Sequence, residues 1–291
     1  MKNIQEIQTK KFFEKNSTNW SLKADFKKNK ILNTIQARNL FALKIIKQYK
    51  LKYHLDVGCG SGDLSYASSK ISNKSIGLDF AQSMIDIAEK KFSRKNLSFE
   101  CKSVFNYQPN SAFDAISANG FIEYLSIVQI KNFIKFCKKN LKKNGFLILG
   151  SRNRLYNLFS LNEFSHNEIH KKTFKKFYLE SINLAKSHLS NFLKSKKINF
   201  EDAQLKQPKT GINVDKRHQF SPSQLINLLE RYNFKIIEIS PINCHPVIPK
   251  IYNSNINYKK ISNFISLDKN KLGLIPFASS FMIAAKKLNF K

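Results

Sequence analysis

The sequence predicts an α/β domain built around a mostly parallel β-sheet. From residue 51 onward, short apolar strand-like segments alternate with amphipathic helical segments. A glycine-rich turn follows the first of these strand segments, and a last strand-like segment closes the chain. Alternation of this kind builds right-handed βαβ units whose strands lie parallel in one sheet. A chain of 291 residues is long enough for one such domain with a sizeable insertion.

The elements follow in order along the chain. Residues 1–50 have a basic, helical pattern, with a helix expected over 31–49. Strands are expected at YHLDV, SIGLDF, LSFEC, FDAIS and NGFLILG, over 53–57, 75–80, 97–101, 113–117 and 144–150. Helices are expected between them, and the clearest places five apolar side chains on one face: Ile130, Phe133, Ile134, Cys137 and Leu141.

The alternation stops over 151–217 and then resumes. This interval has no strand pattern, but a helical stripe of apolar residues runs from Phe174 to Phe192. The stripe consists of Phe174, Tyr178, Ile182, Ala185, Leu189 and Phe192. Ser221 and Gln224 then form a capping box around Pro222 at the start of a helix. Strands are expected over 234–239 and 279–287. We therefore expect an N-terminal helical arm or cap (1–50) and one domain (51–291) with an inserted lid (151–217).

The net charge of +30 raises the question of a nucleic-acid partner. The positive charge is nearly all lysine, with arginine at positions 38, 94, 152, 154, 217 and 231 alone. Abundant Lys, Asn, Ile and Phe beside sparse Gly, Pro and Ala is the bias that A/T-rich codons produce, so the charge does not require such a partner. Nucleic-acid readers favour arginine for bidentate contacts. A nucleic-acid partner is disfavoured but stays open.

Location and metal content are also bounded by the sequence. The amino terminus has no apolar core typical of a secretory signal, and no apolar run approaches the ~20 residues that span a bilayer. The four cysteines form no CxxC pair. These features predict reduced thiols, a cytoplasmic location and no metal site. Peripheral contact with a membrane stays open, because lysines accompany the apolar stripe in 174–192.

The turn HLDVGCGSGDLS (54–65) indicates which ligand the sheet holds. A dinucleotide-binding turn reads G-x-G-x-x-G, but here Asp63 stands at the third glycine position and Gly62 comes one residue early. Asp56 and Asp63 flank the turn, and no phosphate-binding lysine follows it. Carboxylates repel a pyrophosphate and attract a cation. Asp79 ends the next strand, about 20 residues on, where a carboxylate can bind two ribose hydroxyls. Together they predict a cationic, phosphate-free nucleoside.

These segments resemble the class I S-adenosylmethionine-dependent methyltransferases. LDVGCGSGDLS matches their first motif, and IGLDFAQSMIDIAEKK matches the second. FDAISANGFIEYL and LKKNGFLIL match the fourth strand with its loop and the turn into the fifth strand. The resemblance is strong over 51–150 and weaker over 218–240. It implies a Rossmann-like sheet of seven strands, the last antiparallel, with helices on both faces.

The resemblance also implies S-adenosylmethionine as the cofactor and a set of residues that bind it. Asp56 is expected near the amino group, the glycine turn near the methionine part, and Asp79 near the ribose. The family often has an acid after the third strand for the adenine amino group, and here Ser103 stands at that place. The expected cofactor-binding residues are Asp56, Gly58, Cys59, Gly60, Gly62, Asp79, Phe80, Met84, Ser103, Val104 and Asn119.

The methyl acceptor is less well marked. Methyl transfer to a hydroxyl needs a group that removes its proton, and Glu123 and His218 are the candidate catalytic residues. Tyr124, Arg152 and Arg154 are expected to contact the substrate, since arginines can hold an anionic group bidentately. We favour a small-molecule acceptor methylated on oxygen, with anionic, lipid-linked and glycan-linked molecules all considered. An RNA methyltransferase, and a binding module that holds the cofactor without catalysis, are the alternatives.

Overall fold

The computed structural model describes residues 4–25, 32–203, 218–252, 256–265 and 272–288. Within them a sheet of seven strands has the order β3-β2-β1-β4-β5-β7-β6. The strands are β1 (Tyr53–Val57), β2 (Lys74–Asp79), β3 (Leu97–Cys101), β4 (Phe113–Ala118), β5 (Leu141–Arg152), β6 (Phe234–Cys244) and β7 (Ala278–Lys287). The first five pair in parallel, and β7 runs antiparallel to its neighbours β5 and β6. The predicted sheet, with its antiparallel last strand, is confirmed.

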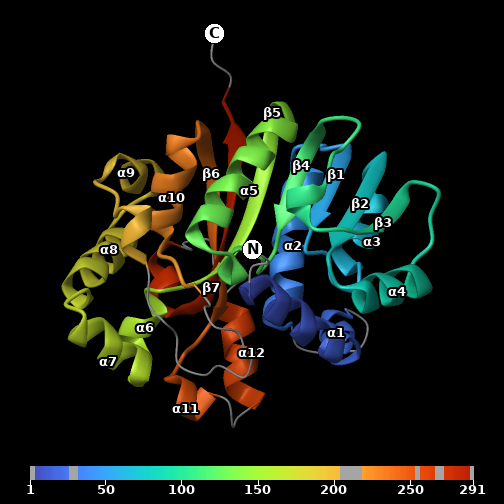
Figure 1. Cartoon of the computed structure of the whole chain (residues 1–291). Coiled ribbons are helices and arrows are strands. Elements are labelled where there is room, and N and C mark those ends of the chain that lie inside the picture. The colour runs from blue at the N-terminus through green and yellow to red at the C-terminus, as the bar shows by residue number, and fades with distance from the viewer. Residues whose placement is uncertain (1–3, 26–31, 204–217, 253–255, 266–271, 289–291) are drawn as a thin grey trace.

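Helices surround this sheet (Figure 1). The α-helices are α1 (Ile4–Ala24), α2 (Thr34–Gln48), α3 (Asp63–Ser69), α4 (Gln82–Lys91), α5 (Ile127–Asn140), α6 (Tyr156–Phe159), α7 (Glu163–His170), α8 (Phe174–Lys186), α9 (Leu189–Lys194), α10 (Pro222–Arg231), α11 (Pro249–Tyr252) and α12 (Ile256–Ile265). Short 3₁₀ turns are η1 (Val104–Asn106), η2 (Ile122–Tyr124), η3 (Phe200–Ala203) and η4 (Leu272–Phe277). The capping box of Ser221 and Gln224 at the start of α10 is present as predicted.

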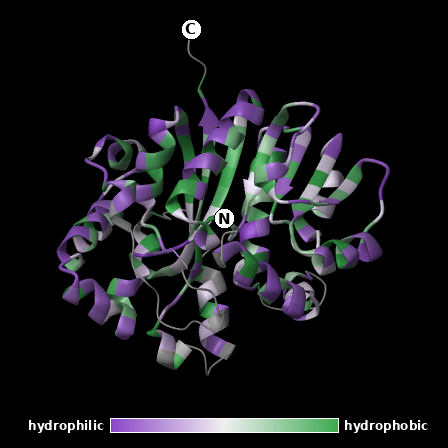
Figure 2. Cartoon of the chain, viewed as in Figure 1, coloured by the Kyte–Doolittle hydropathy of each residue, from purple (hydrophilic) through white to green (hydrophobic). Residues whose placement is uncertain are grey.

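The alternation of strand side chains divides the core into two layers. Ala115, Phe146 and Ile148 pack with α2 on one face, while Ile116 and Leu147 pack with α5 and α10 on the other. Figure 1 shows α5 in front of the sheet and α2 behind it. In Figure 2 apolar colour concentrates on the central strands and hydrophilic colour on the outer helices. The helical arm thus completes the core through α2.

The strand order reverses direction between β1 and β4. The chain moves outward from β1 to β2 and β3, then returns to β4 on the other side of β1. The turns that follow β1 and β4 therefore separate at their carboxyl ends and leave a crevice, which is where open α/β sheets bind ligands. The glycine turn and the loop 119–125 both border this crevice.

The described part of the insertion, 151–203, differs from the sequence expectation in one respect. The stripe from Phe174 to Phe192 is interrupted at Ser187, whose extended backbone separates α8 from α9. Within α8 the buried residues include Phe177 and Leu184, whereas Tyr178 of the expected stripe is exposed. A polar contact holds this face of α8 against the domain, because Glu180 accepts a hydrogen bond from the Ser223 amide in the first turn of α10 (2.8 Å). Residues 204–217 of the expected lid lie outside the described residues.

No helix among the described residues is both long enough and apolar enough to cross a bilayer.

Candidate functional site

Two cavities meet in the crevice at the carboxyl ends of β1 and β4. The apolar cavity is walled by side chains that include Leu78, Phe80, Met84, Val104 and Phe105. The polar cavity is lined by residues that include Arg38, Asn39, Asp56, Glu123 and Arg152. Six residues border both cavities: Trp20, Gly58, Gly60, Asn119, Gly120 and Tyr124. A ligand with an apolar half and a charged half can therefore lie across the glycine turn.

The backbone of the glycine turn is held by the end of β2. The amides of Gly58 and Cys59 donate to the carbonyl of Leu78 (2.7 and 3.1 Å), and the amide of Gly60 donates to Oδ2 of Asp79 (3.0 Å). Gly58, Gly60 and Gly62 have φ of 68°, 53° and 78°, which a side chain would strain. At Gly58 and Gly60 the turn thus presents backbone to both cavities.

Gly62 has a different role from its neighbours. It borders neither cavity, and a Cβ there would lie 2.6 Å from the ring of Phe99 and 2.9 Å from the Cβ of Ala88. Its small size lets the start of α3 pack closely on β3 and α4. Gly62 thus shapes the turn through close packing, and its expected place among the cofactor-binding residues stays a prediction.

Asp79 lies on the wall of the apolar cavity. Its second oxygen, Oδ1, accepts the amide of Ala81 (3.0 Å), so both oxygens are oriented by backbone amides. Burial raises the pKa of Asp79, and hydrogen bonds from the amides of Ala81 and Gly60 oppose that rise. Each oxygen has further lone pairs, which can accept hydroxyl groups of a ligand.

Asp56 lies at the floor of the polar cavity. It is 2% exposed, and its two oxygens accept hydrogen bonds from Ser117 (2.7 Å) and Ser65 (2.8 Å). Ser117 in turn contacts Nε2 of the buried His54 at 2.8 Å. Burial raises the pKa of Asp56 to about 6 despite the two hydroxyl donors, and nearby Asp79 and Asp63 raise it further. Burial lowers the pKa of His54 to about 3, which keeps this imidazole neutral. A ligand cation at Asp56 would favour its ionised form.

Asp63 was expected to add a second negative charge beside the turn. It borders the polar cavity, but one oxygen accepts the hydroxyl of Ser61 (2.6 Å) and the ammonium of Lys91 lies 3.1 Å from the other. Lys91 therefore offsets this charge. The attraction for a cation at the turn comes chiefly from Asp56 and Asp79.

The loop 119–125, which follows β4, lines one side of the polar cavity. Oε1 of Glu123, which is 2% exposed, lies 3.6 Å from Nη1 of Arg38, and Arg38 also donates to Oγ of Ser280 (2.6 and 2.9 Å). Gly120 has φ of 70°, and a Cβ at this residue would overlap the Arg38 guanidinium. Asn119 donates to Oδ1 of Asn39 (3.0 Å), while its own buried Oδ1 has no protein partner among the described residues. An acceptor atom is thus available to a ligand at the junction of the cavities.

The other predicted residues divide into those that border the cavities and those that do not. Phe80, Met84, Ser103 and Val104 border the apolar cavity, Cys59 and Arg152 border the polar cavity, and Asn119 and Tyr124 border both. The predicted roles of these residues remain predictions. Burial raises the pKa of Cys59 well above its ordinary range, and so keeps it a thiol.

Arg154 and His218 border neither cavity. Arg154 is 1% exposed and makes two hydrogen bonds with the buried Glu168, from Nε (2.8 Å) and Nη2 (3.0 Å). Its guanidinium also lies 4.3 Å from the ring centre of Phe177. These contacts hold α7 and α8 against the end of β5. The amide of His218 donates to the carbonyl of Glu123 (2.7 Å), and its ring packs beside Phe220. In this arrangement Glu123 is the predicted base candidate that faces the polar cavity.

Sequence reasoning missed the contribution of α1 to the site. Glu6, Thr9, Phe13 and Trp20 of this helix border the apolar cavity, and Oγ of Ser103 donates to Oε1 of Glu6 (3.3 Å). Glu6, Phe13 and Trp20 are spaced by seven residues, which places them on one helix face. That spacing was the available signal. Of the described part of the insertion, only Arg152 borders either cavity, so among the described residues it is α1, and not the insertion, that lines the apolar cavity.

Comparison with known proteins agrees with this geometry. Residues 55–145 match the family model described as a methyltransferase domain. Over this segment the chain is therefore similar to methyltransferase domains. Its glycine turn, Asp79 and the loop after β4 all lie inside the matched segment.

Two curated relatives of this chain are both named ubiquinone biosynthesis O-methyltransferase. The protein of Bradyrhizobium diazoefficiens is 32% identical over 37% of this chain and 42% of its own length. The protein of Actinobacillus pleuropneumoniae is 27% identical over 55% of this chain and 70% of its own length. The chain thus matches less than half of the first relative.

A solved structure shares the fold of this chain. The N-methyltransferase NodS from Bradyrhizobium japonicum, in complex with S-adenosyl-L-homocysteine, superposes with a TM-score of 0.55 at 12% identity, over 97% of this chain and 100% of NodS. Because NodS is an N-methyltransferase and the curated relatives are O-methyltransferases, the fold alone does not determine the acceptor.

The cavities fit S-adenosylmethionine, the cofactor of this family. The apolar cavity suits a purine ring, Asp79 suits the ribose hydroxyls, and the polar cavity suits the charged amino acid part. The buried Oδ1 of Asn119, which has no protein partner among the described residues, is the kind of acceptor that such a ligand satisfies.

Proposed function

We propose that the protein transfers a methyl group from S-adenosylmethionine to an oxygen atom of a small molecule. The observation that carries this proposal is the meeting of the apolar and polar cavities at Gly58, Gly60 and Asn119. One cofactor spanning that junction brings its sulfur next to the polar cavity, where an acceptor can bind. The names of the two curated relatives support oxygen as the acceptor atom.

Different residues of the site bind different parts of the cofactor in this proposal. When bound, S-adenosylmethionine supplies a methyl group activated by its sulfonium centre. Asp79 accepts the ribose hydroxyls, and Asp56 with Asn119 accepts hydrogen bonds from the ammonium of the methionine part. The glycine turn allows close approach because no side chain intervenes there. These contacts orient the methyl group toward the polar cavity, and orientation is the main contribution that such a transfer requires.

The acceptor binds between Glu123, Arg38 and Arg152 in this proposal. All three border the polar cavity. Glu123 accepts the proton of the acceptor hydroxyl as the C–O bond forms and the C–S bond breaks. Arg38 orients Glu123 through the contact at 3.6 Å, and Arg152 provides a charge for an anionic group on the acceptor. Arg154 has no part in this step, since it is paired with Glu168 inside the insertion.

The division into a helical cap (1–50) and an inserted lid (151–217) belongs to the same proposal. The contribution of α1 to the apolar cavity supports the cap. We also retain a cytoplasmic location, which the four free cysteines support.

The proposal is tested by labelling. The whole protein is incubated with methyl-labelled S-adenosylmethionine and, in separate reactions, a panel of catechols and phenols, a panel of amines and carboxylates, and RNA. We expect label in hydroxyl acceptors. Label in RNA alone would support the nucleic-acid alternative, and cofactor binding with no transfer to any pool would support the binding module.

Substitution then assigns the base. We expect Glu123→Gln to lower kcat by about 10²- to 10⁴-fold, the range typical of a lost general base, with little change in cofactor affinity. Glu89→Gln, the same change on the exposed face of α4, is the matched control. A comparable loss in His218→Gln with full activity in Glu123→Gln would assign the base to His218.

A further inference from the structure

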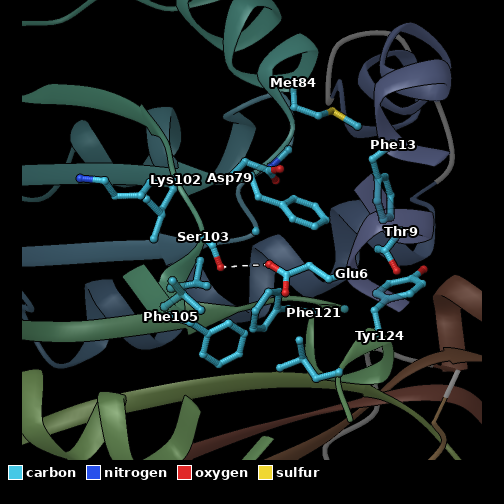
Figure 3. Close-up of a pocket in the computed structure, with 18 of the residues that line it drawn as sticks. Glu6, Thr9, Phe13, Asp79, Met84, Lys102, Ser103, Phe105, Phe121 and Tyr124 are labelled. Carbon is cyan, nitrogen blue, oxygen red and sulfur yellow. Dashed lines mark hydrogen bonds between the residues drawn. The ribbon is translucent and has the colours of Figure 1, made fainter. Parts of the chain in front are cut away.

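The apolar cavity has one polar end away from the glycine turn. Most of its wall is apolar or aromatic, and among its lining residues the carboxylates are Asp79 and Glu6. Both oxygens of Asp79 accept backbone amides at the glycine-turn side of the cavity. Glu6 lies beside Ser103, whose hydroxyl donates a hydrogen bond to it (Figure 3). A planar base that fills the apolar cavity therefore meets a carboxylate at its far edge.

Glu6 is oriented by the sheet side of the cavity. Oγ of Ser103 donates to its Oε1 at 3.3 Å, and this is the hydrogen bond that the described residues give to its side chain. The second oxygen of the carboxylate retains its capacity to accept from a ligand. Figure 3 shows the side chain of Lys102 pointing away from Glu6, so the Lys102 ammonium does not pair with the Glu6 carboxylate.

The helix that carries Glu6 is fixed at several other points. Both oxygens of Glu14 accept amides of the first turn of α4, from Gln82 (2.8 Å) and Ser83 (3.0 Å). Gln5 donates to the carbonyl of Tyr124 (3.2 Å), and the rings of Phe13 and Tyr124 meet edge to face at 5.5 Å. These contacts come from both ends of the cavity. Glu6 is therefore held over it by the docking of the whole helix rather than by one flexible contact.

We propose that Glu6 accepts a hydrogen bond from the exocyclic amine of the adenine ring, so that α1 completes the nucleobase site. This inference rests on the proposed function and adds a specificity-determining residue to it. An amine is a donor and matches a carboxylate, whereas a carbonyl at the same position of the ring is an acceptor and is repelled by it. Glu6 therefore selects adenine against hypoxanthine, and it does so from a helix outside the sheet.

The test compares two ligands that differ only at that edge of the base. S-adenosyl-L-homocysteine carries the amine beside an unprotonated N1, and S-inosyl-L-homocysteine carries a carbonyl beside an N1 that bears a proton. Their dissociation constants are measured by calorimetry for the wild type, Glu6→Ala, Glu6→Gln and the matched control Glu89→Gln. Thermal unfolding and circular dichroism confirm that each variant is folded.

We expect the wild type and Glu89→Gln to bind the adenosyl ligand about 100-fold more tightly than the inosyl ligand, and Glu6→Ala to reduce this ratio about tenfold or more. Glu6→Gln is expected to bind the inosyl ligand more tightly than the wild type does, because its amide can donate to the carbonyl. Equal weakening of both ligands in Glu6→Ala, with an unchanged ratio, would show that Glu6 acts only in docking α1 and would overturn the inference. Failure of the wild type to bind either ligand would instead refute the proposed function.

Discussion

At the scale of single residues, Asp56 is the titratable group that most directly couples the site to pH. Burial raises its pKa to about 6 from an ordinary value of 3.8, although Ser117 and Ser65 both donate to it. The direction of the pH effect on binding follows from the positive charge of the ligand's amino group. A cationic amino group binds the ionised carboxylate, so protonation of Asp56 opposes binding.

We therefore predict that affinity for S-adenosyl-L-homocysteine is constant above pH 7 and falls as the pH drops through 6, approaching tenfold per unit. Calorimetry between pH 5 and 8 measures this, with Asp56→Asn expected to flatten the profile and Asp86→Asn, on the exposed face of α4, to leave it unchanged. A carboxyl with a raised pKa costs stability above that pKa, and the cost is relieved as the pH falls. At pH 7, the Asp56→Asn protein should therefore have a melting temperature no lower than that of the wild type. An unaltered affinity profile in Asp56→Asn would rule out this residue as the titrating group.

Arg154 shows how burial can change the role that a residue type suggests. Together with Glu168 it forms an ion pair whose side chains are 1% and 0% exposed, with further hydrogen bonds to Glu168 from Asn157 (3.0 Å) and Thr173 (2.5 Å). Removal of one member leaves the other as an uncompensated buried charge.

We predict that Arg154→Met lowers the free energy of unfolding by about 3–5 kcal/mol, while the paired change Arg154→Met with Glu168→Leu costs less than either substitution alone. Arg152→Met, two residues earlier and bordering the polar cavity, should cost less than about 1 kcal/mol. Chemical denaturation measures these differences. The folded Arg154→Met protein should bind S-adenosyl-L-homocysteine as the wild type does; a large loss of affinity without loss of stability would restore Arg154 to the site.

At the scale of elements, the contact between α1 and α4 replaces a local helix cap. Ala81 precedes α4 and makes no side-chain cap, so Glu14 of α1 accepts the amides of Gln82 and Ser83 instead. Although burial opposes it, these hydrogen bonds lower the pKa of Glu14 below its ordinary value. A lowered carboxyl pKa stabilises the docked helix above the ordinary pKa, and this contribution is lost as the pH falls through the lowered value.

We predict that Glu14→Gln weakens the docking of α1 by about 1 kcal/mol at pH 7, a typical value for a lost cap or a carboxylate at a helix start. Hydrogen exchange of the α1 amides should then be about fivefold faster, while exchange in α5 stays unchanged. Glu89→Gln is again the control. Unchanged exchange in α1 would mean that the aromatic contacts of Phe13 and Trp20 alone hold the helix.

The elements also show which parts of the molecule could be predicted from the sequence. The segments that became β1 to β5 carry their own signals, because a buried parallel strand is a short apolar run between turns. Ser221 and Gln224 mark the start of α10 for the same local reason. Glu6 could not be assigned in this way. The spacing of Glu6, Phe13 and Trp20 marks one face of α1, but the partner Ser103 lies 97 residues away, and no local pattern indicates which surface that face covers.

The face of α8 was predicted incorrectly for a related physical reason. Its most apolar stripe contains Tyr178, but the buried face contains Phe177 and Glu180. The guanidinium of Arg154 packs on Phe177, and Glu180 accepts an amide of α10. Burial raises the pKa of Glu180 to about 7, which shows how strongly this anchor is desolvated. Tertiary polar contacts thus outweighed the apolar pattern of the isolated helix.

At the scale of the whole molecule, the helical arm divides into two functions. Its second helix, α2, belongs to the core, where Phe41, Ala42, Ile45 and Ile46 pack on the sheet. Its first helix, α1, covers the apolar cavity and packs mainly on α4 and the loop after β4. A ligand that fills the apolar cavity contacts the residues of α1 that line it. We therefore expect α1 to move when the cofactor exchanges, while the sheet and α2 stay in place.

We predict that ligand binding protects α1 selectively from proteolysis. Trypsin has cleavage sites in α1 at Lys10, Lys11 and Lys15. In the insertion it has sites at Lys171, directly after α7, and at Lys175 in α8, which border neither cavity. With S-adenosyl-L-homocysteine at about 100 times its dissociation constant, cleavage in α1 should slow by up to about 100-fold, since cleavage follows the population of the open form. Cleavage in the insertion should change little. Mass spectrometry of the fragments over time distinguishes the two sets of sites. Equal slowing at both would indicate that the ligand acts through global unfolding, and rapid cleavage of α1 in the bound protein would show that the helix is not part of the closed site.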